Sequence, residues 1–139
     1  MIHNLLVGYD GSTASDAAFD LGLDLARRYD ADLHVLSVAR PPEFGEDVET
    51  EAVIEQTQRH FDRVLFPLQA RADGVRSHFH VVVGHPAEQL VLYAERHHVD
   101  HIVVGHRGHS RFDRWLTGSV AKRVVSYAPC AVTVVRPRA

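Results

Sequence analysis

The chain has 139 residues, 45% of them apolar, which fits one domain over residues 1–139 with a substantial core. A formal net charge of -3 at pH 7 excludes the strongly basic surface that nucleic-acid-binding proteins use, so we expect no nucleic-acid partner. No apolar run approaches the roughly 18 residues of a membrane span, no secretory leader is recognisable, and one cysteine cannot form an internal disulfide. We therefore expect a cytoplasmic protein without membrane association.

Strand and helix patterns alternate along the chain. Short apolar or β-branched runs predict five strands, at 2–8, 33–38, 75–83, 101–104 and 132–135. Four helices are predicted between them. A capping box at 13–16 begins the first, the second follows the prolines at 41–42, the third runs from Pro86 to about His98, and the last from about Ser119 to Tyr127. This alternation predicts an α/β fold, a doubly wound parallel sheet with helices on both faces.

The apolar spacing in the first two helices predicts which of their faces pack on the sheet. The predicted face of the first helix is Ala14, Ala18, Leu21 and Leu25. The predicted face of the second helix is Ile54, Phe61, Leu65 and Leu68. Pro67 interrupts that face and should kink or end the helix, because proline removes one internal hydrogen bond.

A glycine-rich segment links the fourth strand to the last helix. It reads Gly105-x-x-Gly108, then nine residues, then Gly118-Ser119. Glycines reach backbone angles closed to other residues and let a ligand approach the main chain, and the N–H groups of Gly118, Ser119 and Val120 would open a helix with its positive end. Tight turns alone would also explain such glycines. The strand before and the helix after them favour a phosphate site.

The charges around these glycines support an anionic ligand, and the motif differs from two well-known phosphate loops. Three arginines, Arg107, Arg111 and Arg114, stand against one acid, Asp113. No GK[ST] occurs, and Lys122 falls inside the following helix, which excludes a P-loop. The first strand-to-helix turn, GYDGS at 8–12, does not match the dinucleotide G-x-G-x-x-G pattern.

Three segments together resemble the universal stress protein family. They are the glycine pattern, the opening VGYDGS at 7–12 and the closing APCAVTVVR at 128–136. The resemblance covers nearly the whole chain, and the intact glycine pattern is similar to that of the family's ATP-binding branch. It implies a strand order of 3-2-1-4-5 in an adenine nucleotide α-hydrolase-like, Rossmann-like fold. It also implies ATP, with or without Mg²⁺, as the bound cofactor.

The strand order that the resemblance implies would place the two ends of the site together, in the crevice at the carboxyl ends of strands one and four. Asp10 would accept hydrogen bonds from ribose or adenine, although aspartate before glycine is also a common turn residue. Val38, at the end of strand two, is the backbone contact to adenine that the resemblance implies. The predicted cofactor-binding residues are Asp10, Gly11, Val38, Val104, Gly105, Arg107, Gly108, Gly118, Ser119 and Val120.

These features predict a nucleotide-dependent regulator of stress response or dormancy, with no catalytic residues and at most slow ATP hydrolysis. Rapid phosphoryl transfer needs a base or a residue that positions water, and a cradle for a metal ion, whereas the sequence offers one carboxylate and no P-loop lysine. The apolar edge strand, Val132, Thr133, Val134 and Val135, predicts a homodimer that covers it. The alternative is a nucleotide-free dimeric interaction module of the same fold. A receiver domain is nearly excluded by Val83-Gly84-His85 after strand three, and a flavodoxin-like FMN site would place its phosphate loop after strand one.

The chain also has eleven histidines and one cysteine, Cys130, which are residue types that can bind metals. His78 and His80 share one face of a strand, so a metal site would need partners from elsewhere. No cysteine and histidine spacing matches a zinc motif, and we expect no specific metal site. Cys130 precedes a β-branched run, and we expect it to have a packing role.

Overall fold

The computed structural model describes residues 1–41, 48–107 and 118–137. Their parallel strands form one sheet in the order β3-β2-β1-β4-β5, which confirms the predicted fold class and strand order. The predicted ends of the strands and of the third helix differ from the observed ends by two residues or fewer. The elements are β1 (Asn4–Gly8), α1 (Thr13–Tyr29), β2 (Asp32–Ala39), α2 (Val48–Arg71), β3 (Ser77–Val83), α3 (Pro86–Arg96), β4 (His101–Gly105), α4 (Ser119–Tyr127) and β5 (Ala131–Val135).

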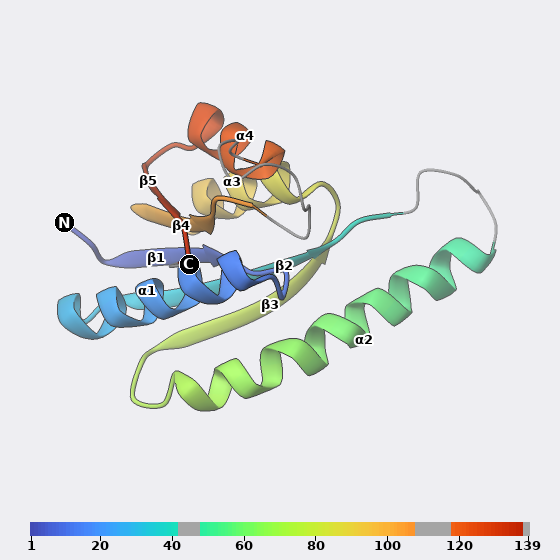
Figure 1. Cartoon of the computed structure of the whole chain (residues 1–139), viewed down its shortest axis with the longest axis horizontal. Coiled ribbons are helices and arrows are strands. Elements are labelled where there is room, and N and C mark those ends of the chain that lie inside the picture. Colours follow the sequence, from blue (N-terminus) through green and yellow to red (C-terminus); the bar gives the residue numbers. More distant parts are fainter. Residues whose placement is uncertain (42–47, 108–117, 138–139) are drawn as a thin grey trace.

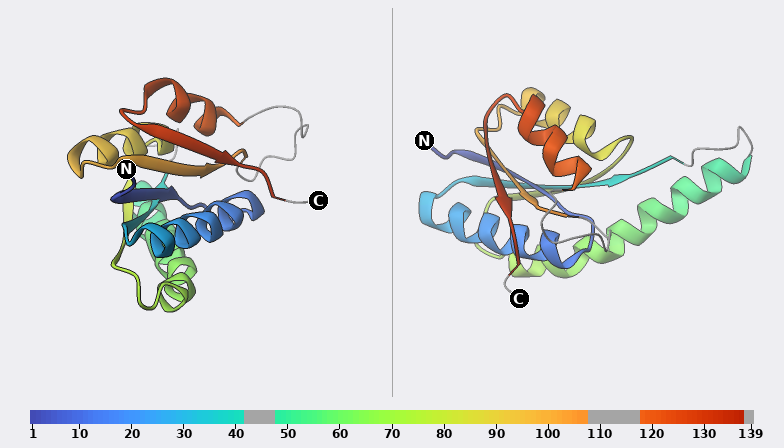
Figure 2. Two further views of the ribbon diagram at one scale, coloured as in Figure 1. Left: turned by 90° about the vertical axis from the view of Figure 1, so that its left-hand side faces the viewer. Right: turned by 45° about the horizontal axis from the view of Figure 1, so that its top comes forward.

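Helices cover both faces of the sheet, with α1 and α2 on one face and α3 and α4 on the other (Figures 1 and 2). Each face has its own core, and the central strand supplies both. Leu5 and Val7 of β1 pack toward α1 and α2, whereas Leu6 between them packs toward α3 and α4. Because β1 is buried on both faces, its sequence is a continuous apolar run instead of an alternating one.

The first helix begins one residue earlier than a cap at Thr13 would require. Ser12 is the N-cap, and its Oγ accepts the N–H of Ser15 at 3.1 Å. The most buried apolar side chains of α1 include Phe19 and Leu23, while Leu21 and Leu25 of the predicted face are only partly buried. The buried face is therefore rotated from the predicted one.

Close contact between α1 and the sheet depends on a glycine. A Cβ on Gly22 would lie 2.5 Å from Cγ2 of Val7 in β1, so a larger residue would push the helix away. Packing density in protein interiors leaves no room for that atom. Gly22 therefore sets the spacing between α1 and β1.

The prediction that Pro67 kinks or ends the second helix is wrong as to the end, because α2 continues to Arg71. Pro67 is exposed, while Leu68 beside it and Leu65 are buried in the core. Burial of these leucines, worth roughly 1.5–3 kcal/mol each, offsets one missing backbone hydrogen bond. The amino-terminal part of α2 extends beyond the sheet (Figure 1).

Two further expectations concern the end of the chain and the membrane. Cys130 is partly buried and packs against the core under α3 and α4, which agrees with a packing role. Burial raises the pKa of its thiol. Across the described ranges, none of the helices combines the length and apolar character needed to cross a membrane.

Candidate functional site

A cleft of about 870 Å³ opens at the carboxyl ends of β1 and β4. These neighbouring strands send their following helices, α1 and α4, to opposite faces of the sheet, which makes this edge the topological switch point. Eight of the ten residues predicted to bind a nucleotide line the cleft. They are Asp10, Val38, Val104, Gly105, Arg107, Gly118, Ser119 and Val120.

Of the remaining two predicted residues, one does not line the cleft and the other lies outside the described residues. Gly11 follows Asp10 in the turn after β1 and has a positive φ of 84°, so its role is to let that turn form. Gly108 lies outside the described residues, as do Arg111, Asp113 and Arg114. The structure therefore describes Gly105 at the start of the glycine pattern and Gly118-Ser119 at its end.

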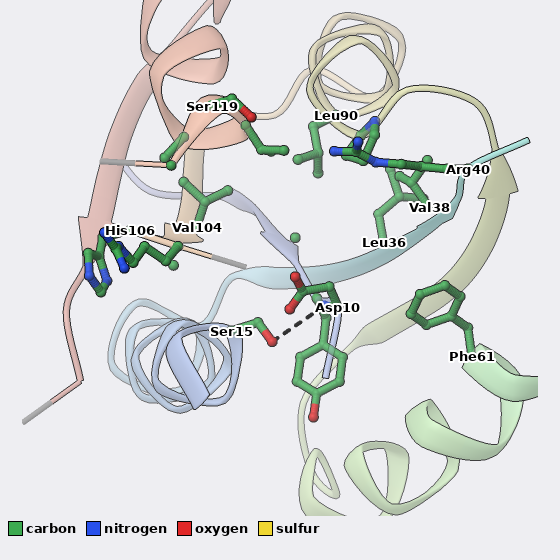
Figure 3. Close-up of a pocket in the computed structure, with 18 of the residues that line it drawn as sticks. Asp10, Ser15, Leu36, Val38, Arg40, Phe61, Leu90, Val104, His106 and Ser119 are labelled. Carbon is green, nitrogen blue, oxygen red and sulfur yellow. Dashed lines mark hydrogen bonds between the residues drawn. The ribbon is translucent and has the colours of Figure 1, made fainter. Parts of the chain in front are cut away.

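Asp10 enters the cleft from the end of β1 (Figure 3). Its Oδ1 accepts the N–H of Ser12 at 2.9 Å, and its own N–H donates to Ser15 Oγ at 3.3 Å. The aspartate thus stabilises the turn before the first helix, which was its alternative predicted role, and it also faces the cleft. Both roles are compatible, because an ionised carboxylate accepts several hydrogen bonds.

Gly105 is required by the protein's own packing. It is absent from the described glycines that have positive φ, so freedom of the backbone does not explain it. A Cβ there would lie 2.7 Å from the carbonyl carbon of Ala14 in α1. Glycine at this position lets the end of β4 approach the start of α1, and this brings the two sides of the cleft together.

The start of α4 forms the wall of the cleft opposite Asp10 (Figure 3). The expectation that Gly118 offers its N–H to a ligand is wrong, because that N–H donates to the carbonyl oxygen of His106 at 2.6 Å. The N–H of His106 in turn donates to the carbonyl oxygen of Val135 in β5 at 2.8 Å, so Gly118 is held to His106 and His106 is held to the sheet. Ser119 and Val120 begin the helix at the cleft, and its first turn holds no acidic residue. The positive end of the helix dipole is therefore not neutralised locally.

His106 and Arg107 follow β4 at the same wall. Only 9% of His106 is exposed, and its Nδ1 has no hydrogen-bond partner among the residues that the structure describes. Burial, and secondarily the charges of Arg136 and Arg107, lower the pKa of this imidazole. His106 is therefore neutral at pH 7, and the positive charge at this wall comes from the arginine.

Comparison with known proteins assigns this arrangement to a family. The family model described as the universal stress protein family matches residues 1–136. The chain belongs to the universal stress protein family. A universal stress protein of Methanocaldococcus jannaschii is 31% identical over 139 residues, covering 95% of this chain and 81% of its relative.

Solved structures of the family share the fold. The universal stress protein UspA from Lactobacillus plantarum is 27% identical and superposes with a TM-score of 0.88, over 96% of this chain and 97% of that one. A universal stress protein family protein from Arabidopsis thaliana, described with AMP bound, is 20% identical. It superposes with a TM-score of 0.68 over 99% of this chain and 93% of that one. At that identity the likeness shows the fold alone.

The sequence did not reveal that α2 supplies one wall of the cleft. Thr57, His60 and Phe61 of α2 line it, as does Arg40 just after β2, and Phe61 and Arg40 lie at the side of the cleft away from His106 (Figure 3). The pattern around Phe61 predicted a core-facing residue, and the side chain is only partly buried. How far α2 reaches over the edge of the sheet depends on its crossing angle, which local periodicity does not reveal.

The cleft combines an acceptor, an apolar middle and a positive end. Asp10 is the only carboxylate among its lining residues in the described chain. Leu36, Leu90 and Val104 supply apolar surface to the cleft around Asp10 (Figure 3). Such a lining can hold a ligand with a flat apolar part, hydroxyl donors and an anionic tail.

Proposed function

We propose that this universal stress protein binds ATP in the cleft and acts as a nucleotide-dependent regulator of stress response or dormancy. The observation that carries the proposal is the placement of Asp10 across the cleft from the acid-free start of α4. A hydroxyl-rich sugar suits the carboxylate of Asp10, and a polyphosphate suits the start of α4. The AMP described in the Arabidopsis thaliana protein supports a nucleotide as the class of ligand.

The residues of the cleft fit the parts of ATP. Asp10 would accept hydrogen bonds from the ribose hydroxyls, and Val38 would contact the adenine. The first N–H groups of α4, the hydroxyl of Ser119 and the guanidinium of Arg107 would hold the phosphates. Since Asp10 is the one lining carboxylate in the described chain, Mg²⁺ would be held mainly by phosphate oxygens and water.

We further propose that the protein holds ATP with little turnover. Rapid phosphoryl transfer needs a base or residue that positions water, and a cradle for the metal. Asp10 Oδ1 already accepts the N–H of Ser12, and no second carboxylate of the described chain lines the cleft to share the task. The bound nucleotide would then act as a signal through its presence.

Replacing Asp10 tests nucleotide binding. Asp10→Asn keeps an oxygen for the N–H of Ser12 but removes the charge and one acceptor, and we expect ATP affinity to fall by about tenfold or more. Titration calorimetry on nucleotide-free protein measures it. Asp73→Asn, in the exposed turn before β3, is the matched control and should leave affinity unchanged.

Two results would contradict the proposal. Absence of ATP binding to the unmodified protein at about 1 mM would favour the nucleotide-free interaction module. Phosphate release under multiple-turnover conditions at about one per second or faster would show an ordinary enzyme instead of a regulator with little turnover.

A further inference from the structure

A cluster of imidazoles lies at the opposite end of the sheet from the cleft, near the amino ends of β2 and β3. Asp32 and His34 are two residues apart in β2 and therefore share a face of the sheet. His78 of β3 is the register partner of His34 and lies on the same face, which α3 covers. Tyr93 of α3 and His97, which follows the end of α3, contact His34 with their rings.

The distances within this cluster are close to those of a metal site. One ligand atom from each of Asp32, His34 and His78 can be chosen so that all three lie within 4.8 Å of one another. His78 Nε2 and Asp32 Oδ2 are 3.6 Å apart. In a tetrahedral zinc site with bonds of about 2.0–2.1 Å, ligand atoms are about 3.3–3.4 Å apart. Small side-chain movements would therefore close the site.

Neighbouring residues already hold the carboxylate in a suitable state. Arg76 Nε donates to Asp32 Oδ1 at 2.6 Å and thereby orients the carboxylate. The other oxygen, Oδ2, is the one directed to His78. Asp32 is thus held with one oxygen used by Arg76 and the other facing the imidazole of His78.

A second neighbour orients His34. Its Nδ1 lies 2.6 Å from the hydroxyl of Tyr93. In the tautomer in which Nδ1–H donates to the Tyr93 oxygen, Nε2 carries the lone pair that a metal needs, which is how protein groups orient metal-bound histidines.

His78 is the ligand that can move. Its ring is stacked on that of His34 with centroids 4.7 Å apart, and 47% of its side chain is exposed. Stacked rings direct their lone pairs in parallel, so the ring of His78 must tilt to share an ion with His34. Its exposure gives the room for that tilt, whereas His34 is fixed by α3.

We propose that Asp32, His34 and His78 bind one Zn²⁺-class transition-metal ion, with a fourth position open to water. Two imidazoles and one carboxylate suit zinc and its neighbours, whereas Mg²⁺ requires oxygen ligands. This proposal departs from the expectation of no specific metal site, because the partner that His78 needs lies 46 residues earlier and meets it only through the register of β2 and β3. The site is separate from the cleft and does not depend on nucleotide binding.

Zinc titration of the full-length, tag-free and chelator-treated protein tests the site without nucleotide. Competition with a chromophoric chelator of known affinity should show one Zn²⁺ per chain, unaffected by an excess of Mg²⁺. His78→Gln should weaken binding by about tenfold or more, because it removes a direct ligand. Asp32→Asn should also weaken it.

His85→Gln is the matched control. His85 is an exposed histidine beyond the other end of β3, so this variant should bind zinc like the unmodified protein. Circular dichroism should show both histidine variants folded. Zinc binding that is absent, that is equally tight in His78→Gln, or that Mg²⁺ abolishes would overturn the proposal.

Discussion

His34 links the stability of the protein to pH. Only 8% of this residue is exposed, and burial together with the charges of His78 and His97 lowers its pKa from 6.5 to about 4. As the pH falls below 6.5, the unfolded chain therefore takes up a proton before the folded one does. The stability that depends on neutral His34 is complete above pH 6.5 and is lost as the pH falls toward 4.

We expect His34 to lower the free energy of unfolding by roughly 2 kcal/mol between about pH 7.5 and pH 5. Urea unfolding in the presence of a chelator at both pH values measures the change. His34→Leu should remove the part of the pH dependence that His34 causes and leave the smaller part that His106 causes. His85→Gln is the control and should keep the full pH dependence of the unmodified protein. An unchanged pH dependence in His34→Leu would contradict this assignment.

At the scale of single elements, α2 carries a proline that its packing tolerates. Pro67 is exposed within the helix, so its replacement changes the backbone without disturbing the core. We expect Pro67→Ala to raise the free energy of unfolding by about 1–2 kcal/mol, since alanine restores an internal hydrogen bond but adds freedom to the unfolded chain. Urea unfolding at neutral pH measures it.

Gln69→Ala, at another exposed position of α2, is the control and should change the free energy of unfolding by less than about 0.5 kcal/mol. A Pro67→Ala protein that is no more stable than the original would show that α2 is shaped around the proline. In that case, the missing hydrogen bond would not be the main cost at this position.

At the scale of the whole molecule, the sheet has two edge strands of different character. β3 carries exposed histidines, whereas β5 is β-branched and follows α4, on which Val125 and Tyr127 are exposed. We propose that two copies pair through β5, as the sequence predicted. Sedimentation should then give twice the chain mass of 15.6 kDa.

A charge placed in each edge strand distinguishes the two edges. Val134→Lys should shift the protein toward monomer, because two lysines would meet across the two-fold axis. Val83→Lys puts the same charge in β3 and should leave the dimer intact. A monomeric unmodified protein, or a Val83→Lys variant that dissociates as readily, would argue against pairing through β5.

Much of the fold and of one cleft could be predicted from local patterns. Apolar runs alternate with amphipathic segments, and this pattern predicted a parallel sheet covered on both faces. Asp10 follows the end of β1 and Gly105 ends β4, so any sheet that makes β1 and β4 parallel neighbours brings them to the same edge. The resemblance supplied the strand order that makes them neighbours.

Only the tertiary structure decided which groups meet across elements. It showed that Gly105 is needed for contact with Ala14, and that α2 supplies Phe61 to the cleft. It also brought Asp32 beside His78. The sequence by itself determined the order of the elements and the ends of the strands to within two residues, because propensity and periodicity act locally. Contacts between elements follow from register and crossing angle, which the packing of the whole core determines.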